Sequence, residues 1–166
     1  MKRLLYVFII LLALVISTQA FGATAGTVTE TLRNVYTTDG ILSFKVVTLT
    51  CTASVDAATY PSTALTSAAN DQLRGWSLMM MSTYNGSTAP TALYDVTLAD
   101  AVGVDILGGA GANRPGTAGV SSQVRPRTDT SLLLPGLRPV YSTLTLAIAN
   151  NAVNSAVVTI QLFFMR

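Results

Sequence analysis

The sequence predicts an all-β protein, an antiparallel β-sandwich of about seven strands with a jelly-roll or immunoglobulin-like arrangement. Several segments alternate apolar and polar residues, which is the period of a half-buried strand. Turn signals such as Asp39-Gly40 and Asn85-Gly86 separate these segments. Half of the 166 residues are hydrophobic and only 11% are charged. Short strands separated by frequent turns are typical of a sandwich.

Residues 1–22 have the layout of a secretory signal peptide. A positive start, Met1-Lys2-Arg3, precedes an uninterrupted apolar run over 4–16, and the small residues Ala20 and Gly22 have the spacing that a signal peptidase needs. We expect cleavage after Gly22, which leaves 23–166 as a single β-sandwich domain. The alternative is an uncleaved anchor, although the run is shorter than the about 20 residues of a spanning helix. The membrane is therefore expected as a partner only through this leader.

The next two strands are expected at 27–35 and 41–53, where Thr and β-branched residues are frequent. In the second segment, the apolar residues share one parity up to Val46 and the other parity from Val47 onward. Either a bulge near Val46 or burial on both faces would explain this change. Cys51 has the second parity, and we expect it in the core as a small hydrophobic residue.

The middle of the chain is expected to alternate between loops and strands. Residues 54–73 form a loop with one or two helical turns near 65–73, and alternation from Trp76 to Tyr84 favours a strand over 74–84. A further strand at 93–98 leads into a turn at Asp100–Gly103, because Asp bonds its own backbone and Gly accepts positive φ.

Two more strands are expected at 140–149 and 156–165. The last segment is apolar on both faces. It is either a central strand or an edge that invites pairing with another chain.

The segment 115–139 is expected to be a long loop with four prolines, an arm that is either mobile or embraces a neighbour. Four arginines in or beside it make up half of the basic residues that remain without the leader, and an apolar run lies within it. Arginine is favoured at interfaces because its planar fork bonds bidentately. The alternative, that these arginines only solubilise a polar loop, stays open. The candidate interface residues are Arg114, Arg125, Arg127, Leu132, Leu133, Leu134 and Arg138.

Composition excludes several function classes. The chain has no histidine and a single cysteine, so Ser-His and Cys-His catalytic arrangements and an intrachain disulfide are excluded. Loss of Lys2 and Arg3 with the leader lowers the ten basic residues to eight, equal to the eight acidic ones. A nucleic-acid binder needs a basic excess, whereas a net charge near zero favours association. We expect no enzyme, no cofactor, no small-molecule substrate and no nucleic-acid partner.

Three motifs each have a functional and a structural interpretation. Gly109-x-Gly111 could cradle a phosphate, but Asn113-Arg114-Pro115 follows in place of a helix, which favours a structural loop. The aspartates 95, 100 and 105 could bind calcium, but a turn cap for Asp100 and solvated or arginine-paired carboxylates for the other two are favoured. The aromatic residues 76, 84 and 94 could form a sugar platform, but a strand Trp is more often in a core or an interface.

The stretch from residue 89 to 114 carries a specific motif, Ala-Pro-Thr-x-x-Tyr-Asp-Val-Thr-Leu-x-Asp-x-x-Gly-Val-Asp-x-Leu-Gly-Gly-Ala-Gly-Ala-Asn-Arg. Together with the Thr-Leu-Thr-Leu-x-Ile and Val-Val-Thr-Ile-x-Leu-Phe-Phe strands, it resembles small proteins of tailed bacteriophages over roughly 89–166. The resemblance implies a virion component, a head decoration or accessory surface protein, without catalytic residues. The signal-like leader departs from this pattern, because such particles assemble in the cytoplasm.

Two functions therefore remain open. The first is a non-enzymatic structural subunit of a phage virion that self-associates, with a trimer favoured, and contacts other virion proteins. The second is a secreted or periplasmic bacterial module that binds a glycan or a cell-surface partner.

Overall fold

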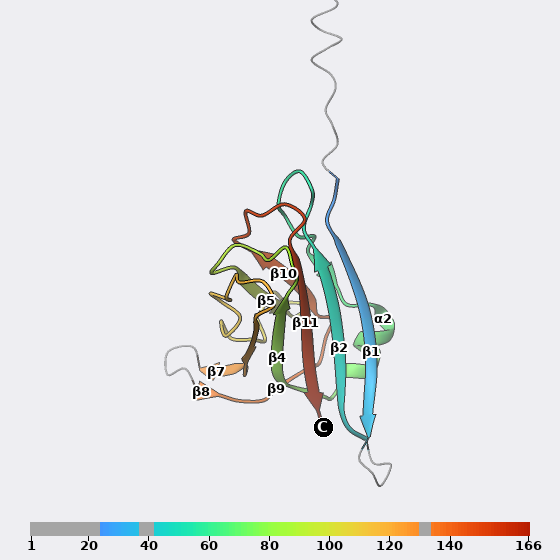
Figure 1. Cartoon of the computed structure of the whole chain (residues 1–166). Helices are drawn as coiled ribbons and strands as arrows, with labels where there is room; N and C mark the ends of the chain where they lie inside the picture. The colour runs from blue at the N-terminus through green and yellow to red at the C-terminus, as the bar shows by residue number, and fades with distance from the viewer. Residues whose placement is uncertain (1–23, 37–41, 130–133) are drawn as a thin grey trace, which may run out of the picture.

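The largest sheet, sheet A, is organised around strand β11 (Val157–Met165). In the computed structural model, which describes residues 24–36, 42–129 and 134–166, β11 lies between β2 (Leu42–Thr52) and β4 (Ser77–Asn85). β1 (Thr27–Tyr36) lies beyond β2, while β6 (Ser121–Val124) and the short β9 (Arg138–Pro139) pair with β4 (Figure 1). All these pairings are antiparallel. The last predicted strand is therefore central.

Two smaller sheets complete the β-structure. Sheet B has the order β3 (Thr63–Ala64), β10 (Thr145–Ala149), β5 (Asp95–Ala99), again antiparallel. β7 (Arg127–Asp129) and β8 (Leu134–Pro135) pair only with each other, and this hairpin projects from the side of the molecule (Figure 1). The antiparallel all-β prediction is thus confirmed, with several two- and three-residue strands that the sequence pattern did not indicate.

One hydrophobic core contacts both sheets and the helix. Successive side chains point to opposite faces of a strand, so alternate residues of β11 and β2 face inward. Ile160 and Leu162 of β11 and Leu49 of β2 are 0% exposed, and they cluster with Leu98 and Leu146 of sheet B. Cys51 belongs to the same cluster, as predicted. Burial of this apolar area is the main stabilising contribution to the fold.

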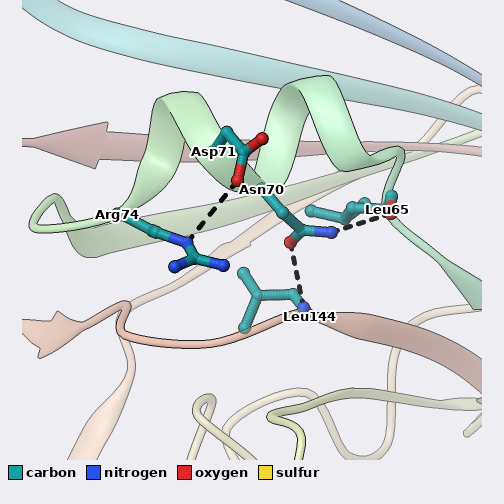
Figure 2. A network of polar contacts seen from close by, with 5 residues as sticks. All are labelled: Leu65, Asn70, Asp71, Arg74 and Leu144. Carbon is teal, nitrogen blue, oxygen red and sulfur yellow. Dashed lines mark hydrogen bonds and ion pairs between the residues drawn. The ribbon is translucent and has the colours of Figure 1, made fainter.

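The single helix of the described residues, α2 (Ser67–Leu73), falls where helical turns were predicted. Thr66 caps its N-terminus, since the Thr66 hydroxyl accepts a hydrogen bond from the Ala69 N–H. Buried Asn70 then joins the helix to sheet B: its amide donates to the Leu65 carbonyl at 2.8 Å and its Oδ1 accepts from the Leu144 N–H at 3.0 Å (Figure 2). Asn70 thereby fixes the helix to the residue that directly precedes β10.

The apolar residues of β2 change from one parity to the other between Val46 and Val47 because both faces of this strand are buried there. The β1–β2 register runs unbroken from Thr27 opposite Thr52 to Val35 opposite Phe44 and shifts only beyond Phe44, so no bulge separates Val46 from Val47. Val46 is only 2% exposed although its parity places it on the outer face. On that face Phe44 and Phe163 meet with their ring centroids 6.4 Å apart. Aromatic side chains therefore cover a patch of the outer face.

The prediction that 115–139 is a long loop is wrong in part, because the segment contains short strands. It contains β6, which pairs with β4 along the edge of sheet A, as well as β7, β8 and β9. β6 reads Ser-Ser-Gln-Val and has no apolar alternation, because an edge strand is held mainly by backbone hydrogen bonds. The strand expected at 140–149 begins only at Thr145, because the Val140 N–H instead donates to the Trp76 carbonyl.

The predicted signal peptide over 1–22 lies outside the described residues. Among the residues that are described, no helix is long and apolar enough to cross a membrane.

Candidate interaction site

The loop between β5 and β6 is built by aspartate side chains that accept backbone hydrogen bonds. Asp105 Oδ1 accepts from the Leu98 and Leu107 N–H groups at 3.0 Å each, and its Oδ2 accepts from the Gly109 N–H at 2.9 Å. Asp100 Oδ1 accepts from Val102 and Val104, which confirms the predicted turn cap. Carboxylates used in this way hold the backbone of a loop in one conformation.

Asp95 has a similar structural role. Its Oδ1 accepts from the Asn113 N–H at 2.8 Å and its Oδ2 from the Asn150 side-chain amide at 2.6 Å. Both Asp95 and Asp105 are partly exposed, as expected for solvated carboxylates, but neither forms an ion pair with a described arginine. Within the described part of the chain, no three potential ligand side chains converge on a metal position.

Arg114 lies within the fold. Its guanidinium donates to the Ala112 carbonyl through Nη2 at 2.9 Å and to Ser122 Oγ through Nη1 at 3.1 Å. The Arg114 N–H donates to the Tyr94 carbonyl at 2.7 Å. Burial lowers the pKa of Arg114. Arg114 thus joins the glycine-rich loop, residues 108–114, to β6. Its side chain is therefore not free to reach a neighbouring molecule.

Arg127 and Arg138 line one cleft of about 500 Å³. They come from β7 and β9, and the backbone of Arg127 is held against the glycine-rich loop because its N–H donates to the Leu107 carbonyl at 3.1 Å. Both arginine side chains are half-buried. The remaining lining residues are Val104, Asp105, Gly108, Gly109 and Thr128.

The charge balance of this cleft is positive. It contains two guanidinium groups and one carboxylate, and the Asp105 oxygens already accept three backbone hydrogen bonds. In the described chain, the one ion pair joins Arg74 to Asp71, so neither cleft arginine has an acidic partner. A guanidinium fork binds a carboxylate bidentately. The cleft can therefore take a carboxylate or another planar oxyanion.

Arg125 lies elsewhere, in a cleft of about 240 Å³ with Met79, Gly136 and the half-exposed Leu137. Leu134 is placed in β8, whereas Leu132 and Leu133 lie outside the described residues. Of the predicted interface residues that the structure describes, Arg127 and Arg138 line one cleft together.

The structure does not support a phosphate cradle at the glycine motif or a sugar platform that includes Trp76 and Tyr94. The Gly108 and Gly109 N–H groups both donate to Asp105, and the Ala110 N–H donates to the Leu107 carbonyl, so this loop does not offer a row of free amides to a phosphate. Trp76 and Tyr94 are 5% and 0% exposed, which confirms the core interpretation and removes them as a sugar platform.

The sequence reasoning missed Val104 and Gly108 as cleft residues. Gly108 has a φ of +59°, and a Cβ there would overlap the Arg127 carbonyl oxygen. A residue with a side chain could not let β7 approach so closely. Three glycines within residues 108–111 indicated that another backbone segment packs closely against this loop. They did not indicate that the segment is β7.

A search of protein-family models and a search of curated proteins find no match for this chain.

Proposed function

We propose that this chain is a non-enzymatic structural subunit of a bacteriophage virion, a surface decoration or accessory protein, which self-associates and contacts other virion proteins. We also propose that sheets A and B are the two layers of a jelly-roll or immunoglobulin-like sandwich. The motif over 89–114 and the two closing strands support the assignment to a phage particle. The trimer expected from the sequence is the first assembly to test.

The cleft with Arg127 and Arg138 carries the proposal of a protein contact. Neither half-buried guanidinium group has an acidic partner among the described side chains, and a carboxylate from a neighbouring protein would pair with both. A contact from this cleft to a different surface of the next copy is head-to-tail. Such contacts close into rings such as trimers.

The proposed structural role includes the expectation that the chain uses no cofactor and no small-molecule substrate. The carboxylates of the loop between β5 and β6 stabilise its backbone, and the buried aromatic side chains pack in the core. The glycan-binding alternative rests on the leader-like residues 1–22.

The direct test is to look for the chain on particles. Phage purified on a density gradient should contain the chain, detected by mass spectrometry and located by antibody labelling in electron micrographs. Recovery of the chain from the periplasm or the medium, and not from particles, would instead support the secreted module.

A second test addresses the cleft. The double variant Arg127→Ala/Arg138→Ala should lose attachment to particles and lower the mass of assemblies in light scattering, with an unchanged melting temperature. Arg125→Ala is the matched control, because Arg125 is an exposed arginine of the same segment but lines another cleft. Attachment should also weaken as ionic strength rises, since salt screens charge pairs near the surface.

A further inference from the structure

The two edges of sheet A differ in how they are protected against pairing with another chain. One edge is formed by β6 and β9, of four and two residues, with Pro126 and Pro139 close by. Short strands and prolines are common ways to prevent edge-to-edge pairing. The other edge is β1, ten residues long and free of proline. In the described residues no strand pairs with its outer side, and Figure 1 shows it as the border of the sheet.

The core is incomplete along β1. The inner-facing residues of β2, such as Val47 and Leu49, are 0% exposed. Leu32 lies opposite Val47 and Val28 lies opposite the equally buried Cys51, so both face the same side, yet Leu32 and Val28 are only partly buried. Another strand beside β1 would bury these apolar side chains, which contributes about 25 cal/mol per Å² removed from water.

The charges on β1 do not prevent this. Inward-pointing charges often protect an edge, but the Glu30 carboxylate is already bound. It accepts hydrogen bonds from the Thr66 N–H at 2.9 Å and from the Thr66 hydroxyl at 2.6 Å, at the start of α2. Arg33, the one other charged residue of β1, lies on the opposite face.

We propose that β1 pairs antiparallel with β1 of a second copy of this chain, so that sheet A continues across a two-fold axis at Leu32. The proposal rests on the self-association proposed above. A two-fold contact is self-complementary, and it is distinct from the head-to-tail contact of the arginine cleft.

The side chains of β1 select this register. With Leu32 opposite Leu32, the inner face also pairs Val28 with Tyr36 of the second copy, which is 57% exposed in the single chain. Moving the axis to Glu30 would place two carboxylates directly opposite each other, and moving it to Arg33 would do the same with two guanidinium groups. Moving it to Asn34 would place two amides at the axis and leave Val28 without a partner on β1. Like charges opposite each other destabilise a sheet, while apolar pairs stabilise it. The same register places Arg33 opposite Thr31, so charges of like sign stay apart.

A lysine placed on the edge tests the pairing. Thr31→Lys puts a charge on the outer face of β1, where one lysine from each copy would crowd the two-fold axis. Thr48→Lys is the matched control, because Thr48 lies directly opposite Thr31 on β2, one strand inside the edge. We expect Thr31→Lys to halve the mass of the assembly in light scattering, while Thr48→Lys leaves it unchanged. Both variants should melt as the wild type does.

A cysteine pair tests the register. Cys51 is buried in the core, so an introduced thiol is the reactive one. Leu32→Cys should form a disulfide between copies under mild oxidation, since directly opposite residues lie within disulfide reach. In this register Thr31 lies opposite Arg33 of the second copy and not opposite Thr31. Thr31→Cys should therefore form several-fold less of the disulfide-linked dimer. A stronger cross-link through Thr31→Cys than through Leu32→Cys would overturn the register.

The other outcomes separate this contact from the proposed function. A wild-type assembly that both lysine variants leave intact overturns the β1 pairing but not self-association. Equal dissociation by both lysine variants also overturns it, since the contact would then use the outer face. A wild-type chain that is monomeric at all concentrations overturns both this pairing and the self-association.

Discussion

The Tyr94 hydroxyl donates a hydrogen bond of 3.0 Å to Asn85 Oδ1 in the interior of the protein. Asn85 is 1% exposed and Tyr94 0%, and Asn85 ends β4 while Tyr94 precedes β5. The Asn85 amide also donates to the carbonyls of Pro115 at 2.6 Å and Thr117 at 3.0 Å. One side chain therefore joins sheet A, the start of β5 and the segment that leads to β6.

Tyr94→Phe should lower the free energy of unfolding by about 1–3 kcal/mol, because Asn85 Oδ1 would stay buried without a donor. Urea denaturation measures this value. Asn85→Leu should cost more, since it removes the acceptor of the Tyr94 hydroxyl, the side-chain donor to the Pro115 carbonyl and one of two donors to the Thr117 carbonyl. Equal stability of Tyr94→Phe and the wild type would show that the hydrogen bond contributes nothing net.

Ile160→Ala should lower the free energy of unfolding by about 2–5 kcal/mol, the cost of a cavity in a well-packed core. Ile160 is 0% exposed and lies on the central strand β11. Thr159→Ala is the control, because the preceding residue points to the outer face. Thermal melts followed by circular dichroism should separate the two variants. Similar melting temperatures would contradict the buried position of Ile160.

The Cys51 thiol should react with a thiol reagent only in the unfolded protein. Burial raises the pKa of Cys51 to about 12, so the folded thiol stays protonated and the nucleophilic thiolate is absent at neutral pH. Mixing with an aromatic disulfide, with and without urea, measures the labelling rate. Fast labelling of the folded protein would contradict the burial.

The same pKa shift predicts a loss of stability at alkaline pH. An unfolded thiol ionises near pH 8.5, whereas the folded one does not until about pH 12. Between these values the unfolded state alone releases the proton, so stability falls as pH rises, by at most about 1.4 kcal/mol per pH unit. Cys51→Ala should reduce this slope in urea titrations at pH 8 and pH 10. An unchanged slope would assign it to other groups.

Gly111→Ala should prevent folding or strongly destabilise the loop between β5 and β6. A Cβ at Gly111 would overlap the Val96 carbonyl oxygen, in backbone that cannot move without breaking β5. Gly119→Ala is the control, since a Cβ there meets nothing within 4 Å. Its positive φ of 70° should cost only about 1 kcal/mol. Soluble yield and melting temperature distinguish the two variants.

The longest strands could be predicted from the sequence because their residues favour a strand that packs on a core. Alternation located β4, β-branched content located β1, and apolar residues on both faces located β11. The burial of Val46 explains why β2 has apolar residues of both parities. β6 could not be predicted in this way, since the residues of this edge strand carry no apolar period.

The arginine cleft could be predicted only in part. Arginine-rich composition marked the segment, but which arginines meet depends on backbone contacts far apart in sequence. The contact of Arg127 with Leu107 places it beside the glycine-rich loop, while hydrogen bonds to Ala112 and Ser122 fix Arg114 elsewhere. The spacing of residues in the sequence does not show which distant segments form such hydrogen bonds.

The central place of β11 has a consequence for how the chain matures. β2 can pair with β1 as a local hairpin, but its other neighbour lies far downstream, since Thr52 faces Val157. Pairing of strands so distant in sequence slows folding, because the long intervening chain must first be brought together. Until β11 has been synthesised, both β2 and β4 keep an open side. Sheet A can therefore close only after its last strand, β11, has been made.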